Sequence, residues 1–394
     1  MICRRERRCK QPVRFAEPPW DRHSPQWIAL DEELAEDHVA REIVAAVADL
    51  DLTQVRESYS ASGSPPHPPD LMLAMILIEL RRGRRSPSQW DRDTRYDKVA
   101  QWAGFGLRPA RSCWYEFCDR MAPFVDELNR QVLHKARRLG ITTAERATLD
   151  GSAVAANASR HRVLNESRLR KRMQALHEAI RAGEEGLPVG ALPAWMAKSP
   201  ATRMLQQARY GRAGDHLKTL LEANEQRCPS ERQARKKVVV SPGDPDAALG
   251  RDKFNVFRPL CNVQIVHDLD SPLMLGYEAF AQPTDAVTLE PMIRKTKALT
   301  GAKVSKMVHE ELIEAHRAFM ETAESKKLTK LRGQIAERIY ADLKEHRELR
   351  RFRRRGLVRC RTELGLNVLA HNLKEVASLP RPEQHSVAQA PQPP

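Results

Sequence analysis

The sequence lacks an apolar run long enough to cross a lipid bilayer. Its most apolar stretch, residues 71–78, lies between Asp70 and Glu79, whereas a membrane-spanning helix needs about 20 apolar residues. We therefore expect residues 71–78 to form a buried helix and the protein to have no membrane contact. Residues 1–10 are basic but no apolar segment follows them, so we also expect no secretory signal.

The cysteines show no metal-binding or redox spacing. None of the seven is separated from another by two residues, which is the spacing of zinc knuckles and redox motifs. We interpret all of them as reduced thiols of a cytosolic protein. The sequence also lacks the aromatic motif of RNA-binding sheets and an amphipathic membrane anchor, so only its charge supports an RNA-associated or membrane-associated role.

What the chain has in excess is positive charge. It carries a formal net charge of +15 over 394 residues, a length sufficient for two or three domains. Such a balance favours a polyanionic partner, nucleic acid first and an anionic membrane second.

Hydrophobic periodicity divides the chain into helical segments around a small set of strands. Residues 262–267 and 273–280 are apolar runs on either side of a turn, which predicts a β-hairpin, and a helix is expected over 289–299. The pattern favours an α+β or mixed fold, in which one mixed sheet is flanked by helices. The predicted divisions are a loosely ordered arm at 1–30, a helical domain at 31–140, a mixed domain at 141–377 with a helical insertion at about 161–236, and a disordered tail at 378–394.

Two acidic residues far apart in the sequence are candidates for a metal site. Asp150 ends a short predicted strand, residues 147–150, and Glu337 lies in a predicted helix with Lys344 seven residues later on nearly the same face. Two-metal phosphoryl transfer needs carboxylates that converge on a pair of ions, and carboxylate oxygens suit Mg²⁺. The alternatives are that Asp150 forms a turn with Gly151 and that Glu337 lies on an ordinary solvated helix.

An arginine-dense stretch follows Lys344. This density is typical of contacts with a phosphate backbone, although a surface arginine run without a nucleic-acid partner is the alternative. The expected DNA-contacting residues are Lys344, Arg347, Arg350, Arg351, Arg353, Arg354 and Arg355, with Arg359 and Arg361 behind them.

The Asp150 segment, the Glu337–Lys344 helix and several further segments along the chain together resemble the insertion-sequence transposases of the DDE class in bacteria. The resemblance implies a ribonuclease H-like catalytic domain behind an N-terminal helical domain that binds transposon ends. The segments that carry the resemblance are 37–38, 68–73 and 117–121 in the helical part, Asp150-Gly151-Ser152 with 156–159, Asp244-Pro245-Asp246, 262–264, 337–347 and 369–373.

The resemblance assigns roles to individual residues. It implies that Asp150 is the first metal ligand and Glu337 the last, that two Mg²⁺ or Mn²⁺ ions bind between them, and that Lys344 contacts transposon-end DNA. Many members have a Tyr and an Arg before the glutamate; Arg332 matches the Arg, but Thr329 stands near the Tyr position. The implied partners are duplex DNA at terminal inverted repeats and at the target, with a homodimer as the form expected in the transposition complex. The implied location is the nucleoid in the bacterial cytoplasm.

The chain departs from the family at the middle carboxylate. The family has an Asp at the end of a fourth strand, yet no Asp occurs from Thr300 to Glu337, so we interpret residues 300–310 as a deletion junction and the sheet as incomplete. Asp285 is a poor substitute because the resemblance puts it in a loop after the hairpin. The sequence therefore leaves two functions open: a metal-dependent transposase crippled by a missing ligand, and a catalytically inactive DNA-binding remnant or regulator of transposition.

Overall fold

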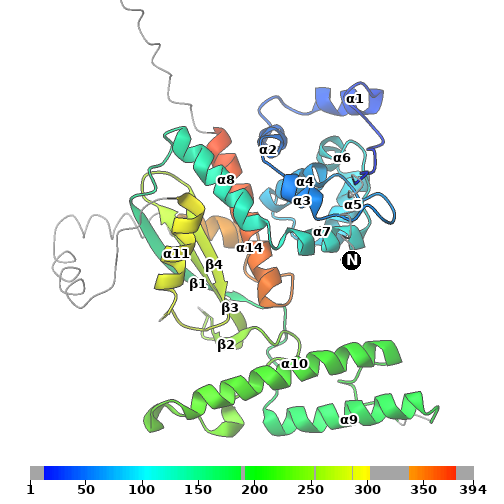
Figure 1. Ribbon diagram of the computed structural model, residues 1–394, viewed down its shortest axis with the longest axis vertical. Coiled ribbons are helices and arrows are strands. Elements are labelled where there is room, and N and C mark those ends of the chain that lie inside the picture. Colours follow the sequence, from blue (N-terminus) through cyan, green and yellow to red (C-terminus); the bar gives the residue numbers. More distant parts are fainter. Residues whose placement is uncertain (1–12, 188–190, 253, 286, 302–336, 379–394) are drawn as a thin grey trace, which may run out of the picture.

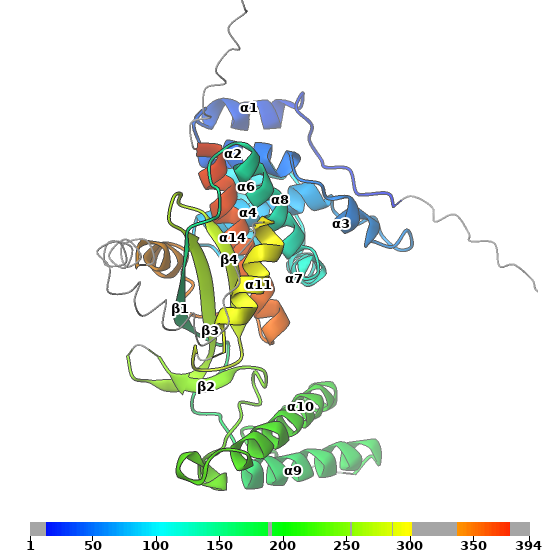
Figure 2. The same ribbon diagram turned by 60° about the vertical axis from the view of Figure 1, so that its left-hand side comes forward.

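The structure is a computed structural model, and Figures 1 and 2 show it in two views. It describes residues 13–187, 191–252, 254–285, 287–301 and 337–378. The described residues build an α+β fold, in which a small antiparallel sheet is surrounded by helices.

The chain begins with a group of helices that share one apolar core (Figure 1). These helices are α1 (Pro25–Glu33), α2 (Val39–Ala48), α3 (Thr53–Glu57), α4 (Pro69–Arg81), α5 (Pro87–Tyr96), α6 (Lys98–Ala103), α7 (Arg111–Met121) and α8 (Val125–Arg138). Pro69 starts α4 at a position where a missing N–H costs nothing, and the side chains from Met72 to Leu80 are buried. The buried helix predicted over residues 71–78 is thus confirmed.

Residues 13–30, for which we expected loose order, make defined contacts instead. Helix α1 begins within them, and the Trp27 ring stacks on Phe105 with centroids 5.4 Å apart. The Trp27 indole N–H also donates to the Trp102 carbonyl at 3.1 Å. A large aromatic side chain with a bonded polar atom is sufficient to hold such a segment against the helices.

Four strands form the sheet, with the long strand β3 paired on both of its edges. The strands are β1 (Ala147–Ala155), β2 (Ala248–Arg251), β3 (Phe257–Asp268) and β4 (Met274–Phe280). Strand β1 lies along one edge of β3, and β2 and β4 lie along the other, all antiparallel. The β3–β4 pairing confirms the predicted hairpin, but no parallel strand of a mixed sheet is among the named strands of the described residues.

Strand β1 does not end at Asp150 as predicted but continues through Gly151 to Ala155. The reason lies on the neighbouring strand, because Gly151 pairs with Gln264 and a Cβ at Gly151 would come within 2.2 Å of the Gln264 side-chain nitrogen. The glycine leaves room for that side chain within the sheet, so it marks a close approach and not a turn.

Two helices close around the sheet after the hairpin (Figure 2). Helix α11 (Leu289–Thr300) packs on β4, which confirms the helix predicted there, and α14 (Leu357–Ser378) packs on β4, α8, α4 and α2. Because Leu366 and Leu369 belong to the core of the N-terminal helices while Leu364 and Val368 belong to the core of the sheet, α14 joins the two parts into one body.

The start of α14 is held by Asp244-Pro245-Asp246, one of the segments that carry the family resemblance. Asp244 accepts a hydrogen bond from the Gly356 backbone N–H at 2.9 Å, and Asp246 accepts one from the Leu357 N–H at 3.1 Å. The first backbone N–H groups of a helix have no partner within it, so these two side-chain acceptors satisfy groups that would otherwise be unbonded.

A helical hairpin projects from the end of the sheet region, as Figures 1 and 2 show at the bottom. Its helices are α9 (Glu166–Glu184) and α10 (Pro200–Glu225), followed by the short 3-10 turns η1 (Pro229–Glu231) and η2 (Arg235–Lys237). The hairpin has its own apolar core, and Leu164 and Val240 pair at its base through two backbone hydrogen bonds. None of the described helices is both long and apolar enough to cross a membrane.

Candidate functional site

The segment that starts at Glu337 packs directly on the strand that carries Asp150. The Tyr340 hydroxyl donates to the Asp150 carbonyl at 2.8 Å and lies 3.1 Å from the Val263 carbonyl. The Tyr340 ring meets the His267 ring edge to face, with centroids 5.9 Å apart. Burial raises the pKa of the Tyr340 hydroxyl well above its ordinary value, so the phenol stays protonated and serves as a hydrogen-bond donor at neutral pH.

A second contact fixes the same segment one turn later. The Lys344 ammonium bonds to the Ser152 hydroxyl, and it lies 5.5 Å from the centre of the Tyr340 ring. Residues two apart on a strand point to the same face, so Ser152, Lys344 and the Asp150 side chain share one face of β1. Residues 342–346 form a π-helical turn, η3 (Asp342–His346), a feature that is frequent at functional sites.

Glu337 is exposed at the beginning of this segment, and Asp150 is half-buried. Residues three and seven positions apart fall on one side of a helix, so Glu337 precedes Tyr340 and Lys344 on the side that meets β1. No cluster of three or more His, Cys, Asp or Glu side chains with the geometry of a metal site occurs among the described residues.

Asp285 is engaged elsewhere. Its carboxylate accepts hydrogen bonds from Asn262 at 2.7 Å and Gln264 at 2.6 Å, and it lies 3.0 Å from where a Cβ of Gly151 would be. Gly151 and Asp150 are adjacent on β1, and adjacent residues face opposite sides of a sheet. Asp285 therefore approaches the side of β1 opposite to the Asp150 side chain.

The two acids of the hairpin turn also have structural partners. Asp268 is buried and accepts bonds from Ser271 and from the Asp270 N–H, while Asp270 forms a 3.1 Å ion pair with Arg146. These contacts confirm that both are turn residues.

The structure corrects the expectation that Arg347 contacts DNA. Arg347 is fully buried, and its guanidinium bonds to the Asn367 carbonyl at 3.0 Å, to His371 at 3.1 Å and to Asp342 at 2.7 Å. Burial lowers the pKa of Arg347 to about 10, a value at which it remains charged at neutral pH. A guanidinium enclosed in this way cannot reach a phosphate, so it braces η3 against α14.

Most other members of the arginine stretch have carboxylate partners. Arg354 is bonded to Asp119 and lies over the Tyr115 ring, with only 10% of its side chain exposed. The remaining pairs are Arg350 with Glu345, Arg353 with Glu348, Arg359 with Asp119 and Arg361 with Glu278. Arg351 and Arg355 are exposed, and no ion pair between either of them and a described carboxylate is found.

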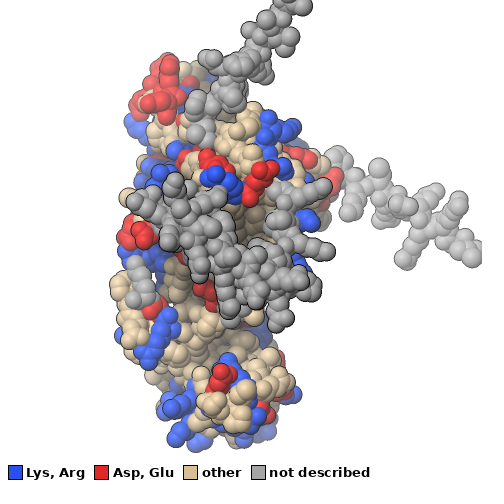
Figure 3. Space-filling view, turned by 90° about the vertical axis from the view of Figure 1, so that its left-hand side faces the viewer, with Lys and Arg blue, Asp and Glu red and all other residues tan. Residues whose placement is uncertain are grey.

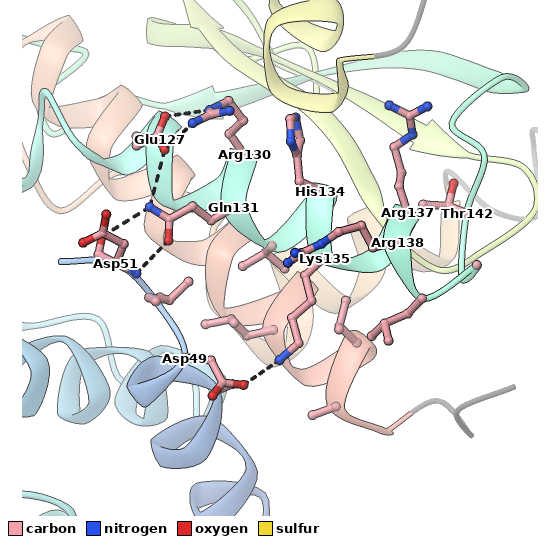
Figure 4. Close-up of a pocket in the computed structure, with 18 of the residues that line it drawn as sticks. Asp49, Asp51, Glu127, Arg130, Gln131, His134, Lys135, Arg137, Arg138 and Thr142 are labelled. Atoms are coloured by element: carbon pink, nitrogen blue, oxygen red, sulfur yellow. Dashed lines mark hydrogen bonds and ion pairs between the residues drawn. The ribbon is translucent and has the colours of Figure 1, made fainter. Parts of the chain in front are cut away.

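A cavity of about 1150 Å³ between α2 and α8, shown in Figure 4, is less suited to a ligand. Two ion pairs lie in its walls: Lys135 binds Asp49 at 2.6 Å, and Arg130 binds Glu127 at 2.6 Å. Gln131 exchanges hydrogen bonds with the backbone of Asp51. These contacts tie α8 to the N-terminal helices, and we interpret the cavity walls as structural.

One family comparison bears on this site. Residues 293–377 match the family model described as Transposase DDE domain. This match supports a DDE transposase. It covers about a fifth of the chain and includes Glu337, Lys344 and α14, whereas Asp150 lies outside it. No curated protein and no solved structure shows a significant match to the chain.

Sequence reasoning missed the two residues that join the transposase segment to the Asp150 strand, Tyr340 and Ser152. The helical spacing of Glu337, Tyr340 and Lys344 contained a usable signal, because it predicts that all three share a face. Two other expectations concern residues outside the described part of the chain. They are the roles of Arg332 and Thr329 and the junction at 300–310, of which only residues 300 and 301 are described.

Proposed function

We propose that this protein is a DDE transposase of an insertion sequence, built for metal-dependent cleavage and transfer of DNA ends and impaired by the lack of a middle aspartate. The observation that carries the proposal is the contact between the transposase-matched segment and β1 through Tyr340 and Lys344. It supports Asp150 and Glu337 as ligands on one side of the sheet.

The direction of the two elements supports a common site. Going from Ser152 to Asp150 covers about 6.6 Å along the strand, and going from Lys344 to Tyr340 covers roughly 5–6 Å along the helix. The two elements therefore run alongside each other in the same direction. Glu337 lies about 4.5 Å further along the helix, so we expect it beside the stretch from Thr148 to Asp150.

The chemistry of the donors suits a hard divalent cation. Both residues offer carboxylate oxygens, the preferred ligands of Mg²⁺ and Mn²⁺, and bound ions would supply nucleophile activation and leaving-group stabilisation. The Lys344 ammonium lies on the same face and would pair with a phosphate of the bound strand. Two carboxylates are fewer than a two-ion site requires, so we expect strongly reduced strand transfer.

Among the residues that the structure describes, no three His, Cys, Asp or Glu side chains are grouped so that they could hold a metal ion, which favours a second candidate function. A chain that keeps its DNA-binding surfaces but cleaves poorly would occupy transposon ends as an inactive remnant, or would act as a regulator by entering mixed oligomers. The two functions differ in cleavage and share DNA binding.

An excision assay separates them. A plasmid carrying the coding region with its flanking DNA is incubated with the full-length protein and Mg²⁺ or Mn²⁺, and excised product is measured. We expect little product, and that product should disappear in D150N and in E337Q but persist in D270N, which removes an acid of the hairpin turn. Excision as efficient as that of an intact family member would contradict the impairment, and product unaffected by D150N would contradict the site.

If the wild-type protein yields no product, binding decides between the two functions. Gel shifts on the flanking DNA at several salt concentrations distinguish specific recognition from general charge attraction. Specific binding without cleavage would establish the inactive DNA-binding form, and its absence in a folded protein would exclude both functions.

A further inference from the structure

A second cavity, of about 580 Å³, lies where the α9–α10 hairpin meets the end of the sheet. Its walls come from the segment after β1, from both helices of the hairpin, and from the loop before α14. Seven arginines line it, and no Asp or Glu does; they are Arg160, Arg162, Arg172, Arg209, Arg258, Arg351 and Arg355.

The positive charge in this cavity has few carboxylate partners, although Asp244, beside the lining residue Gly243, lies close enough to Arg355 for their charges to attract. Of the seven arginines, only Arg258 forms an ion pair with a carboxylate among the described residues, Asp252 at 2.9 Å. In contrast, the arginines of the loop before α14 that lie outside the cavity, such as Arg350 and Arg354, have carboxylate partners. Like charges gathered without counterions repel one another, which an anionic ligand would relieve.

Buried polar atoms in the walls also lack partners. Ser241 is 1% exposed, and its hydroxyl makes no hydrogen bond; the Arg209 Nε is likewise buried and unbonded. Buried polar groups are nearly always satisfied in folded proteins, so these donors point to a ligand that accepts hydrogen bonds. The arginines, a free hydroxyl and the absence of carboxylates match the chemistry of a phosphate group.

The position of the cavity relates it to the candidate metal site. Arg351 lies beside the last residue of β1, since Ala155 pairs with it in a parallel bridge, and Arg355 donates to the Asn157 carbonyl at 3.0 Å. From Asp150 to Ala155 the strand extends about 17 Å. One DNA strand rises 3.4 Å per nucleotide, so this span corresponds to about five nucleotides.

Positively charged groups stand at three points along this span. Lys344 stands beside Ser152, Arg351 beside Ala155, and Arg355 beside Asn157. Figure 3 shows Lys and Arg side chains at several places on the lower part of the visible face, over the helical hairpin, with some Asp and Glu side chains among them.

We propose that this cavity binds the backbone phosphates of one DNA strand, about five nucleotides from the phosphate that a divalent cation at Asp150 would bind. The inference rests on the proposed function for the substrate, but not on retained catalysis. A cavity of this size is in the range of small-ligand pockets and cannot enclose a duplex. The cavity would therefore bind the backbone of a single strand, with the α9–α10 hairpin on one side and the sheet on the other.

The test compares two triple variants of the full-length protein. R160Q/R162Q/R351Q removes three exposed cavity arginines, and R168Q/R212Q/R232Q removes three exposed arginines of the insertion region that do not line the cavity. Binding to a labelled duplex of about 30 base pairs is measured by anisotropy between about 50 and 200 mM NaCl. The salt slope of log K should fall by about 2–3 in the cavity variant, since each lost phosphate contact contributes about 0.9, and by less than about 1 in the control.

A charge-conserving variant adds specificity to the test. R160K/R162K/R351K should keep most of the salt slope, because lysine still binds phosphate as a point charge. Equal slopes for the cavity and control variants would overturn the proposal.

A measurement on the unmodified protein avoids any dependence on how the variants fold. Phenylglyoxal modification followed by mass spectrometry should show Arg160, Arg162 and Arg351 protected by the duplex, with Arg168 and Arg212 unprotected. Protection by millimolar inorganic phosphate but not by DNA would show a small-anion site and overturn the assignment to DNA. The D150N variant separates the two proposals, because it should lose any cleavage while its salt slope and protection pattern remain unchanged.

Discussion

Arg347 provides the sharpest test of whether the arginine-rich segment is a DNA contact or part of the fold. Replacing it with alanine removes a fully buried guanidinium that bonds to Asp342, to His371 and to the Asn367 carbonyl. Removing one partner of a buried charged network costs about 3–5 kcal/mol, mainly because the groups left behind are unpaired. Arg81 lies close enough to oppose the charge of Arg347, so we expect the lower end, about 3 kcal/mol.

The assay for R347A is urea unfolding followed by circular dichroism. With a denaturant dependence of about 3 kcal/mol per molar urea, the midpoint should fall by about 1 M. R351A is the matched control, because Arg351 is exposed and has no carboxylate partner among the described residues; its stability should change by less than about 0.5 kcal/mol. DNA binding should show the reverse order, with R351A lowering the salt slope by about 0.9 and R347A leaving it unchanged. An R347A protein with normal stability and a reduced salt slope would refute the reasoning.

Two further substitutions test the contacts that position the site. Y340F removes the hydroxyl bonded to the Asp150 and Val263 carbonyls and should lower the free energy of unfolding by about 1–2 kcal/mol; an unchanged urea midpoint would contradict this. Burial raises the pKa of Asp244 to about 6 from 3.8, so the folded state binds the proton more tightly and loses stability as pH rises from about 4 to 6. In D244N the amide oxygen can still accept the bond from the Gly356 N–H, so this variant should be more stable than the wild type at pH 7 by up to roughly 3 kcal/mol. If the free energy of unfolding varied with pH in the same way in both proteins, the Asp244 charge would have no such effect.

Strong local patterns predicted several elements well. The apolar run at 71–78 predicted the buried helix α4, and the two apolar stretches around Asp268–Pro272 predicted the β3–β4 hairpin. In each case the pattern lies within the element, so hydrophobic periodicity and turn chemistry were sufficient.

Features that depend on distant residues could not be predicted. Strand β1 continues through Gly151 because Gln264 of another strand needs the space above the glycine. Likewise, Arg347 is buried whereas Arg351 is exposed, although both belong to one arginine-rich run. Which arginine is enclosed depends on the acceptors that α14 presents, and local composition carries no information about them.

The arginine cavity could not be predicted from the sequence for the same reason, because it too depends on contacts between distant residues. Its seven arginines come from five separate stretches of the chain between positions 160 and 355, and no spacing within any one stretch marks them. Only the approach of the insertion to the end of the sheet brings them together.

The structure also separates the groups that would catalyse from those that would hold DNA. The candidate ligand Asp150 lies near the middle of β1, where we propose that a missing carboxylate weakens metal binding, while the arginine cavity begins at Asn157, just beyond the end of the strand, and needs no metal for its charge. Helix α14, whose start is held by hydrogen bonds to Asp244 and Asp246, belongs to the core of both main parts of the fold. Loss of the middle aspartate would therefore abolish cleavage sooner than it would abolish DNA binding, and a chain altered in this way would still compete for the ends that an intact transposase cuts.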